Sequence, residues 1–509
     1  MLKRLCPDRR TVARVLALTA LFFFAAHIYR FTSAAFTHDS LLLNQSEDRS
    51  LQISLGRFLQ PLYWKLRGDI PAPFLVGLAA YAFLSASILL IVRLLDLRST
   101  LSVALVCAVL SANPPLILAG GTFISWMDVY MLALLLAVLG VFVCARFRFG
   151  FLAAPLLLCA SLALYQSYIC AAALLMLILL VRSLLLGISP AAVIREAFAD
   201  LFALLGGLVL YACSLKAVLL LTDETLSNTY NGLSGVGQYG GVSVSALLRD
   251  TYLYPFRCMS APETHLSRFA ALAILAVFLL GGLCLVRLLR ARRLSLPAVL
   301  LSLLAVLLMP FAANAIYFIS KGIIHTAMIY PFFLAFVFPI FLAEQAAPDG
   351  VLLRRARTAM AALLLFFYGC SLVTAHQFYL RRDLEFSSTL SVMTRVIDRM
   401  EQVEGYDPGY TPVAIVGNLS DSYLGMERPG FEHLSSYASN AYAITYLETS
   451  TWYLWQVLGY PVNLVDTATQ HELASREDVR AIPSFPDRDC CRMVDGVLVV
   501  RIGVPGISY

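Results

Sequence analysis

Eleven apolar stretches, separated by short polar segments, fill the first 378 residues of this 509-residue chain. A bilayer core accommodates about 20 apolar residues per helix. The sequence is 60% hydrophobic and only 14% charged, whereas soluble domains are about 25% charged. It therefore predicts a polytopic α-helical membrane protein with about eleven spans, at residues 11–31, 73–95, 99–118, 122–145, 150–165, 168–187, 198–221, 266–289, 297–318, 325–343 and 358–378. One long broken element is the alternative for the pair at 150–187.

Arginine and lysine residues are sorted between the two sides of these spans. They lie in the N-terminal segment and in the loops that follow the even-numbered spans, for example at Arg146, Arg290 and Arg355. The positive-inside rule places those segments in the cytoplasm. The loops 32–72 and 222–265 and the segment 379–509 are then extracytoplasmic. The net charge of +6 reports this orientation and contact with anionic lipid rather than binding of nucleic acid.

Two domains follow from the composition. Residues 1–378 form a transmembrane domain with the outer loops 32–72 and 222–265, and residues 379–509 form a small extracytoplasmic α/β domain. Within the latter, 384–403 and 439–458 have helical periodicity, whereas 413–417 and 497–502 have the composition of short buried strands. The middle of the first outer loop and the segment 244–256 mix apolar, aromatic and basic residues, which is typical of helices in the plane of the membrane surface.

Polar residues at membrane depth are costly, so their distribution is informative. They cluster in the outer halves of the predicted spans, which predicts a polar cavity open to the outer side. Its expected lining is Asp128, Gln166, Lys216, His325, Asn113 and Tyr165. Asp128 and Lys216 lie at similar depth and are candidates for a pair across two helices. A structural ion pair and a substrate contact both remain open for them.

The first outer loop carries the candidate catalytic acids. Asp39 follows the first span by a few residues, which holds it near the membrane surface, and Glu47 and Asp48 are the fallback candidates. A carboxylate there can take a proton from an acceptor hydroxyl. Cations beside it can hold a phosphate leaving group, and the candidates for this are Arg57, Lys65, Arg67 and Lys321. The alternative is that these charges are solvated or contact lipid alone.

No metal or nucleotide site follows from the residue spacing. The sequence has no phosphate-binding glycine loop, no zinc-protease motif and no CxxC motif. Mg²⁺ or Mn²⁺ held by the outer acids is left open as an additional cofactor. The outer cysteines Cys258, Cys490 and Cys491 are either free thiols or include one disulfide to Cys258.

A set of short motifs, taken in order, resembles one known family. They are His38-Asp39, Gly56-Arg57-Phe58, Asn113-Pro114, Trp126, Leu164-Tyr165-Gln166-Ser167, Val413–Gly417, Ile482–Pro486 and Val497–Arg501. Together they resemble the type II glucosyltransferases of the phage serotype-conversion kind, which are membrane glycosyltransferases of the GT-C class. The resemblance covers nearly the whole chain, and it is carried by the order of the motifs rather than by any one of them.

This resemblance implies an enzyme of the bacterial inner membrane that works on the outer face. It would move a hexose, typically glucose, from polyprenyl phosphate to a surface polysaccharide such as O-antigen by a single inverting displacement. In that class an acid of the first outer loop is the base, and Asp39 matches that position. The alternatives are a transporter or flippase of lipid-linked sugars, or another transferase of the polymerase, mannosyltransferase or aminoarabinose transferase type.

Overall fold

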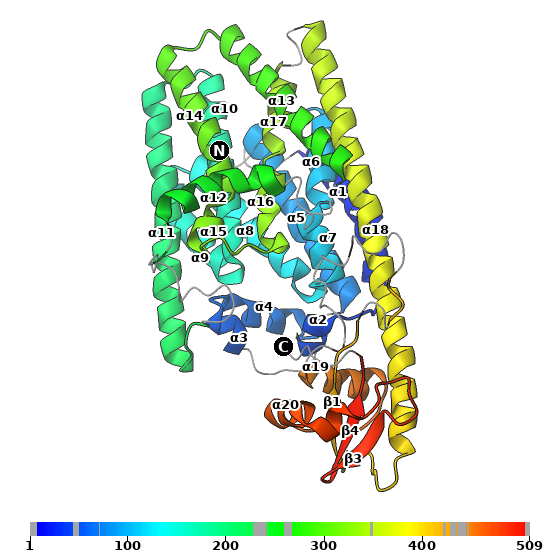
Figure 1. Cartoon of the computed structure of the whole chain (residues 1–509). Coiled ribbons are helices and arrows are strands. Elements are labelled where there is room, and N and C mark those ends of the chain that lie inside the picture. The colour runs from blue at the N-terminus through cyan, green and yellow to red at the C-terminus, as the bar shows by residue number, and fades with distance from the viewer. Residues whose placement is uncertain are drawn as a thin grey trace. The chain divides into compact units, whose positions relative to one another are not determined.

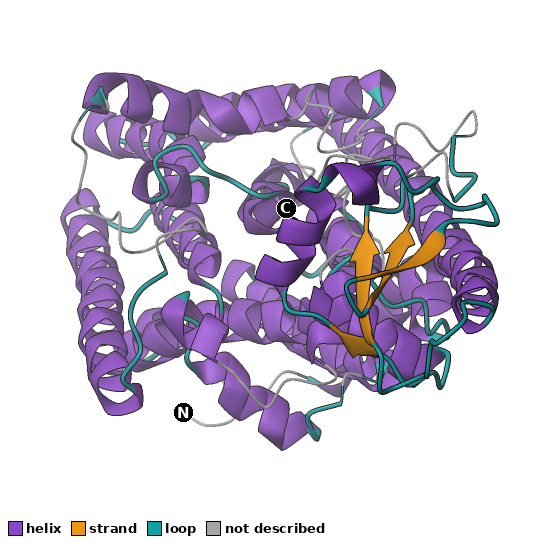
Figure 2. Ribbon diagram, turned by 60° about the horizontal axis from the view of Figure 1, so that its bottom comes forward, coloured by secondary structure: helices purple, strands orange, loops and turns teal. Residues whose placement is uncertain are grey.

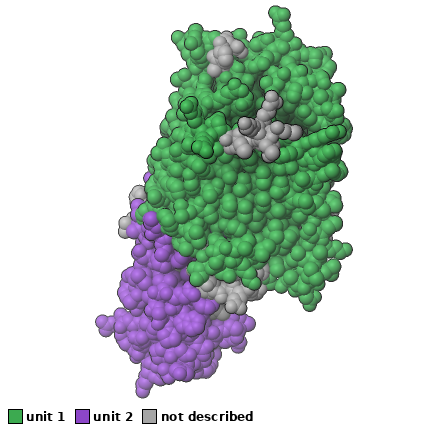
Figure 3. Space-filling view, turned by 180° about the vertical axis from the view of Figure 1, so that it is seen from behind, with its two compact units in different colours: residues 1–31, 48–120, 126–376 green, residues 32–47, 121–125, 377–509 purple. Residues whose placement is uncertain are grey.

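The computed structural model describes residues 8–43, 50–70, 72–227, 241, 243–258, 267–346, 350–420, 424–427, 434, 444 and 447–503. The chain divides into two compact units, which Figure 3 colours separately. The first comprises Met1–Phe31, Asp48–Gly120 and Trp126–His376, and the second comprises Thr32–Glu47, Gly121–Ser125 and Gln377–Tyr509.

The regular elements among the described residues of the first unit are all helices (Figure 1). Short 3₁₀ turns at Ile124–Trp126, Gln166–Tyr168 and Thr326–Ile329 precede α8, α10 and α16. The helices are α1 (Arg9–Phe31), α3 (Ser50–Ser54), α4 (Leu59–Arg67), α5 (Pro73–Leu95), α6 (Thr100–Ser111), α7 (Pro114–Gly121), α8 (Met127–Arg146), α9 (Gly150–Leu164), α10 (Ile169–Leu185), α11 (Pro190–Thr222), α12 (Val244–Cys258), α13 (Arg268–Ala291), α14 (Leu296–Ala313), α15 (Ala315–Ile319), α16 (Tyr330–Leu334), α17 (Val337–Ala346) and the first part of α18 (Val351–Glu401).

The predicted class, a polytopic helical membrane protein, is confirmed. Among the described residues, nine helical segments are long and apolar enough to cross a bilayer, or ten if the bent pair α6–α7 is one span. The fifth predicted span, 150–165, corresponds to α9, which has only 15 residues and is shorter than the about 20 that a bilayer core requires. It is separated from α10 by a break at Tyr165, so the two are distinct helices.

Asn113 accounts for the break between α6 and α7. Its side-chain amide donates to the carbonyl oxygens of Val109 at 3.0 Å and Leu110 at 3.3 Å. Its side-chain oxygen accepts from the backbone amide of Leu116 at 3.3 Å. Pro114, which has no amide hydrogen, then begins α7. Asn113, which was predicted to line a cavity, is fully buried and satisfies the backbone groups that the 45° bend exposes.

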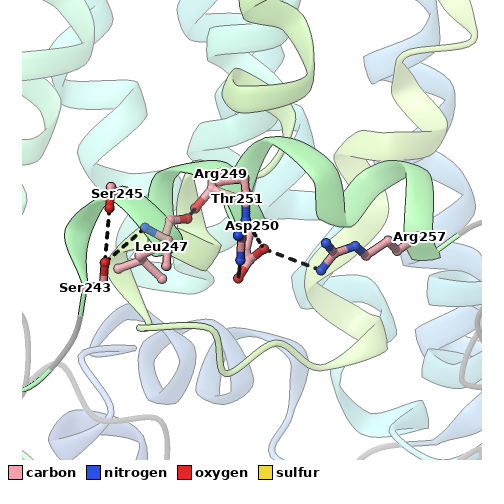
Figure 4. A network of polar contacts seen from close by, with 8 residues as sticks. Ser243, Ser245, Leu247, Arg249, Asp250, Thr251 and Arg257 are labelled. Carbon is pink, nitrogen blue, oxygen red and sulfur yellow. Dashed lines mark hydrogen bonds and ion pairs between the residues drawn. The ribbon is translucent and has the colours of Figure 1, made fainter.

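The segment predicted to lie at the membrane surface, 244–256, forms α12. Its buried face is anchored by Asn314, whose side-chain amide donates to the Thr251 carbonyl at 2.8 Å. On the exposed side, the Asp250 carboxylate accepts from Arg249 at 3.1 Å and from Arg257 at 3.4 Å, as Figure 4 shows. Two exposed arginines therefore share one acid. The exposed side of α12 has a net positive charge as a result.

The second unit contains a four-stranded mixed sheet, seen as arrows in Figure 2. The strand order is β2-β1-β4-β3; β1 runs parallel to both β2 and β4, and β3 pairs antiparallel with β4. Besides the second part of α18, the elements are α2 (His38–Leu43), β1 (Pro412–Val416), α19 (Leu447–Trp452), a π-helical turn (Tyr453–Val457), β2 (Asn463–Leu464), α20 (Thr467–Ser475), α21 (Glu477–Arg480), β3 (Cys491–Val494) and β4 (Val497–Arg501).

Alternate residues of β1 point to opposite faces of this sheet, as strand geometry requires. Val413 and Ile415 pack with residues of α18 and the π-helical turn, whereas Ala414 and Val416 pack with α20 and α21. The sheet is thus covered by helices on both faces, and the predicted strands 413–417 and 497–502 are confirmed. Most of the predicted helix 439–458 lies outside the described residues or in the short α19 and the turn after it. Cys258, Cys490 and Cys491 are free thiols.

A single helix replaces two predicted ones. The span at 358–378 and the helix at 384–403 merge into α18, which runs unbroken over 51 residues. The polarity of the sequence changes sharply after Tyr379, with Arg381, Arg382 and Asp383 in succession. The two arginines favour a helix as much as leucine or methionine does, and neither a proline nor a capping glycine follows directly. The change of polarity therefore marks a change of surroundings and not a helix end.

Candidate functional site

Arg57 lies in the short loop between α3 and α4, and the backbone of this loop is fixed on both sides. Gly56 adopts a φ of +75°, a conformation that glycine accepts readily. The side-chain amide of Gln166 donates to the Leu55 carbonyl at 2.8 Å, and the Tyr211 hydroxyl donates to the Gly56 carbonyl at 3.0 Å. Gln166 and Tyr211 also share a hydrogen bond of 3.0 Å. Gln166 therefore serves to hold the Arg57 loop.

The half-buried Arg57 side chain stacks on an aromatic ring. Its guanidinium carbon lies 4.7 Å from the centroid of the Tyr165 ring, within the range of a cation–π interaction. No carboxylate pairs with Arg57 among the residues that the structure describes. A guanidinium that is oriented by an aromatic ring and not neutralised by an acid is suited to bind an oxyanion.

His325 lies close enough to Arg57 for the positive charge of Arg57 to affect its protonation. Burial first, and then the Arg57 charge, lower the pKa of His325 to about 4. Its Nδ1 accepts the backbone amide of Ala327 at 3.3 Å, so the neutral ring carries its proton on Nε2. His325 is thus a neutral hydrogen-bond donor near Arg57. Lys321, in the preceding turn, is half-buried with a φ of +55°.

A buried ion pair joins α4 to α8. Nη1 of Arg67 lies 2.8 Å and 2.9 Å from the two carboxylate oxygens of Asp128, and the Tyr63 hydroxyl donates to Asp128 at 2.8 Å. Burial, together with this carboxylate, raises the pKa of Tyr63 far above its usual value. The predicted pair of Asp128 with Lys216 is wrong: Lys216 is exposed on α11, and Arg67 neutralises Asp128. The charge of Arg67 is correspondingly already balanced.

The remaining predicted cation on α4, Lys65, is exposed, whereas Gln60 and Trp64 of the same helix are buried. The structure thus brings together Arg57, Tyr165, Gln166 and His325, and leaves Lys65 and Lys216 outside that group. Lys321 lies four residues before His325 in the chain.

In the second unit, Asp39 lies in the first turn of α2, with its side chain 29% exposed. Nε2 of His38 lies 3.4 Å from its carboxylate. Glu47 and Asp48, the alternative bases, lie outside the described residues. Among the described residues, no three His, Cys, Asp or Glu side chains form a group that could hold a metal ion.

The same unit contains a buried charged cluster that the sequence did not single out. Glu385 binds Arg381 at 2.7 Å and Arg382 at 2.5 Å, and all three residues are at most 5% exposed. Arg382 also donates to the Thr122 hydroxyl at 3.3 Å and lies over the Phe378 ring. Two successive arginines directly after an apolar stretch were the available signal, but they were assigned to the start of a soluble segment.

Other residues of the first unit were also missed. Tyr63 and Tyr211 are ordinary aromatic residues of amphipathic or apolar helices, so nothing in their spacing distinguishes them from core residues. Gln60 had a clearer signal, because an amide four residues before Trp64 lies on the same helix face. Its side chain donates to the Leu164 carbonyl at 2.6 Å and accepts from the Trp126 indole at 3.2 Å.

Comparison with known proteins gives one match. The model of a family described as Glucosyl transferase GtrII matches residues 17–336, which is more than half of the chain. No curated protein matches. No solved structure matches either.

Proposed function

We propose, from the premise that the chain belongs to the GtrII glucosyl transferase family, that it moves a hexose from a polyprenyl phosphate donor to a surface polysaccharide. The hexose is glucose by the family's description, and the enzyme is a multi-pass membrane protein. The proposed setting is the outer face of a bacterial inner membrane, with the N-terminus in the cytoplasm, because the basic loops are sorted to one side.

The surroundings of Arg57 are the observation that supports a polyprenyl phosphate donor. It is half-buried, stacked on Tyr165 and held by a loop that Gln166 and Tyr211 fix, and no acid among the described residues neutralises it. A structural arginine buried in this way is normally paired with an acid, as Arg67 is with Asp128. Arg57 therefore has charge available for an anionic ligand, and the phosphate of a lipid-linked sugar is the anion that a glucosyltransferase in a membrane would meet.

In the proposed reaction, a carboxylate takes the proton of an acceptor hydroxyl. The oxygen of that hydroxyl attacks the anomeric carbon of the donor sugar. The bond from that carbon to the phosphate oxygen breaks, and its electron pair leaves with polyprenyl phosphate. Arg57 stabilises the charge that develops on the leaving phosphate, and Lys321 is proposed as a secondary cation. One displacement inverts the anomeric centre, so a β-linked donor gives an α-linked product.

Asp39 is proposed as the base. Its carboxylate is partly exposed and has a histidine neighbour at 3.4 Å, so it can reach an acceptor from solution and lose its proton again. The deeply buried Asp128 is a poor alternative, because Arg67 and Tyr63 occupy its oxygens. General-base catalysis contributes roughly a hundredfold to ten-thousandfold in rate, which is the loss expected when Asp39 is changed.

The test is release of polyprenyl phosphate from polyprenyl-phospho-glucose by the purified protein in lipid nanodiscs, with a surface polysaccharide as acceptor. Wild type is compared with Asp39→Asn and with Asp383→Asn as a matched acid of the same unit. We expect release by wild type and by Asp383→Asn, and loss of at least about a hundredfold in Asp39→Asn. Release at the wild-type rate by Asp39→Asn would remove Asp39 as the base, and no release by any protein would refute the donor.

A further inference from the structure

Helix α4 has its polar side turned inward. Gln60, Trp64 and Arg67 are buried, with an Arg67 side chain only 4% exposed. On the other side, Leu62 and Leu66 are 56% and 81% exposed. Residues three and four apart share a helix face, so the buried face is formed by positions 60, 63, 64 and 67. Hydrogen bonds and one ion pair, rather than apolar packing alone, dock this helix.

Asp128 is the centre of that docking. Its two carboxylate oxygens accept from Nη1 of Arg67, from the Tyr63 hydroxyl at 2.8 Å and from the backbone amide of Val129 at 2.9 Å. The carboxylate is fully buried. Because a buried charge that loses its partner is strongly unfavourable, Asp128 and Arg67 hold each other in place, and they fix the C-terminal end of α4 against the first turn of α8.

The opposite end of α4 is bonded directly to Arg57. The backbone amide of Gln60 donates to the Arg57 carbonyl at 2.9 Å, and the Arg57 amide donates to the Gln52 carbonyl at 2.8 Å. The Gln60 side chain fastens the same turn to Leu164 and Trp126. A displacement of α4 therefore moves the backbone of Arg57, and the stack on Tyr165 depends on where that backbone lies.

We infer that Asp128 is a positioning residue for the donor phosphate: through Tyr63 and Arg67 it sets the place of α4, and α4 sets the place of the Arg57 guanidinium. The inference rests on the proposed function, because it takes Arg57 as the phosphate ligand. Asp128 itself does not touch the donor. It differs in this from Asp39, for which a role in proton transfer is proposed.

The test is a double-mutant cycle on binding of polyprenyl phosphate to the full protein in nanodiscs of uncharged phospholipid. The variants are Asp128→Asn, Arg57→Ala and the two together. We expect each single change to weaken binding at least about tenfold, and the double variant to bind no more than about twofold worse than Arg57→Ala. Residues that act through one another are non-additive. A double variant whose loss is the product of the two single losses would overturn the inference.

Hydrogen exchange of the peptide 55–67 gives a second readout that does not depend on the donor. Exchange at the Gln60 amide reports the bond to the Arg57 carbonyl, and we expect Asp128→Asn to accelerate it at least about tenfold. The matched control is Asp200→Asn, which removes an acid that binds Cys144 at the other end of α8. Asp200→Asn is expected to change neither the exchange nor the binding. Unchanged exchange in Asp128→Asn would overturn the inference whatever the donor proves to be.

Milder variants keep the test decisive if Asp128→Asn does not fold. Arg67→Lys keeps the charge but cannot reproduce the geometry of a guanidinium on a carboxylate, and Tyr63→Phe removes one hydrogen bond. Both are expected to weaken polyprenyl phosphate binding in the wild-type background and not in the Arg57→Ala background. If Arg57→Ala alone binds as wild type does, the proposed phosphate site fails. The exchange experiment then shows separately whether Asp128 fixes α4.

Discussion

The guanidinium of Arg57 lies over the ring of Tyr165, 4.7 Å from its centroid. The two residues come from segments 108 positions apart in the chain, the loop before α4 and the break after α9. Tyr165 is 4% exposed, and its ring centroid lies 4.5 Å from that of Tyr130. The Tyr165 ring is therefore a rigid surface for the cation. The loop therefore presents Arg57 in one orientation, as recognition of a phosphate requires.

The first prediction concerns this stack. Arg57→Ala should weaken binding of polyprenyl phosphate roughly ten- to hundredfold. Arg57→Lys should recover only part of the loss, because an ammonium group keeps the charge but does not stack as a planar guanidinium does. The measurement is binding to the protein in nanodiscs. Arg249→Ala on α12, a well-exposed arginine, is the control, and an equal loss there would show a non-specific effect of charge.

A second prediction is a dependence of stability on pH. Burial and the Arg57 charge lower the pKa of His325 to about 4 in the folded protein, whereas an unfolded histidine titrates near 6.5. Between these values the unfolded chain binds more protons, so stability falls as the pH is lowered from 6.5 to 4 and is constant above. The loss reaches roughly 2–3 kcal/mol near pH 4.

Thermal unfolding in detergent between pH 4 and pH 8 measures this effect. The His325→Gln variant should show a shallower decline on the acid side, because the amide does not titrate and can still accept the Ala327 amide. Identical acid profiles for the variant and the wild type would mean that other groups account for the decline.

Third, the outer face of α4 should lie in lipid. Leu66 is 81% exposed while Gln60 and Arg67 of the same helix are turned inward, an arrangement that is unfavourable in water and favourable at a membrane surface. A phospholipid with a photoreactive acyl chain, incorporated in nanodiscs, should label the Leu66 peptide as it labels Leu221 on the candidate span α11, which is 86% exposed. Tyr410, which is 80% exposed in the second unit, should remain unlabelled. Labelling of α11 without α4 would contradict this.

The fourth prediction concerns the β3–β4 hairpin. Asp495 and Gly496 both have positive φ, at 49° and 80°, which is the geometry of the two-residue turn that joins twisted strands. A β-carbon on Gly496 would meet no atom within 4 Å, so Gly496→Ala tests backbone strain alone. It should destabilise the second unit by about 1 kcal/mol. Proteolytic susceptibility of that unit is the measurement.

Gly282→Ala is the control for the hairpin variant. Gly282 lies inside α13, and a β-carbon there also has no atom within 4 Å. Alanine in a helix interior is favoured over glycine by about 0.5–1 kcal/mol, so this change should be neutral or stabilising. A loss of stability in both variants would point to a general intolerance of glycine replacement.

Local sequence was sufficient for the helical class and for β1 and β4, two of the four strands of the second unit. The period and length of apolar stretches are properties of contiguous residues. Arg57 was one of four cations named as candidate phosphate ligands, and its phosphate-binding role stays a prediction. For α18 the same local reasoning went wrong, since a change in polarity was taken for a helix end.

What the sequence determined by itself is the set of membrane-length helices and the sorting of charge between their loops. Only the tertiary structure decided which charges are already neutralised. Asp128 and Lys216 have similar depth along their helices, but depth does not give the direction in which each side chain points. The docking of α4 gave Asp128 its partner in Arg67, 61 residues away. Ion pairs depend on distances between segments remote in the chain, and hydropathy contains no information on those distances.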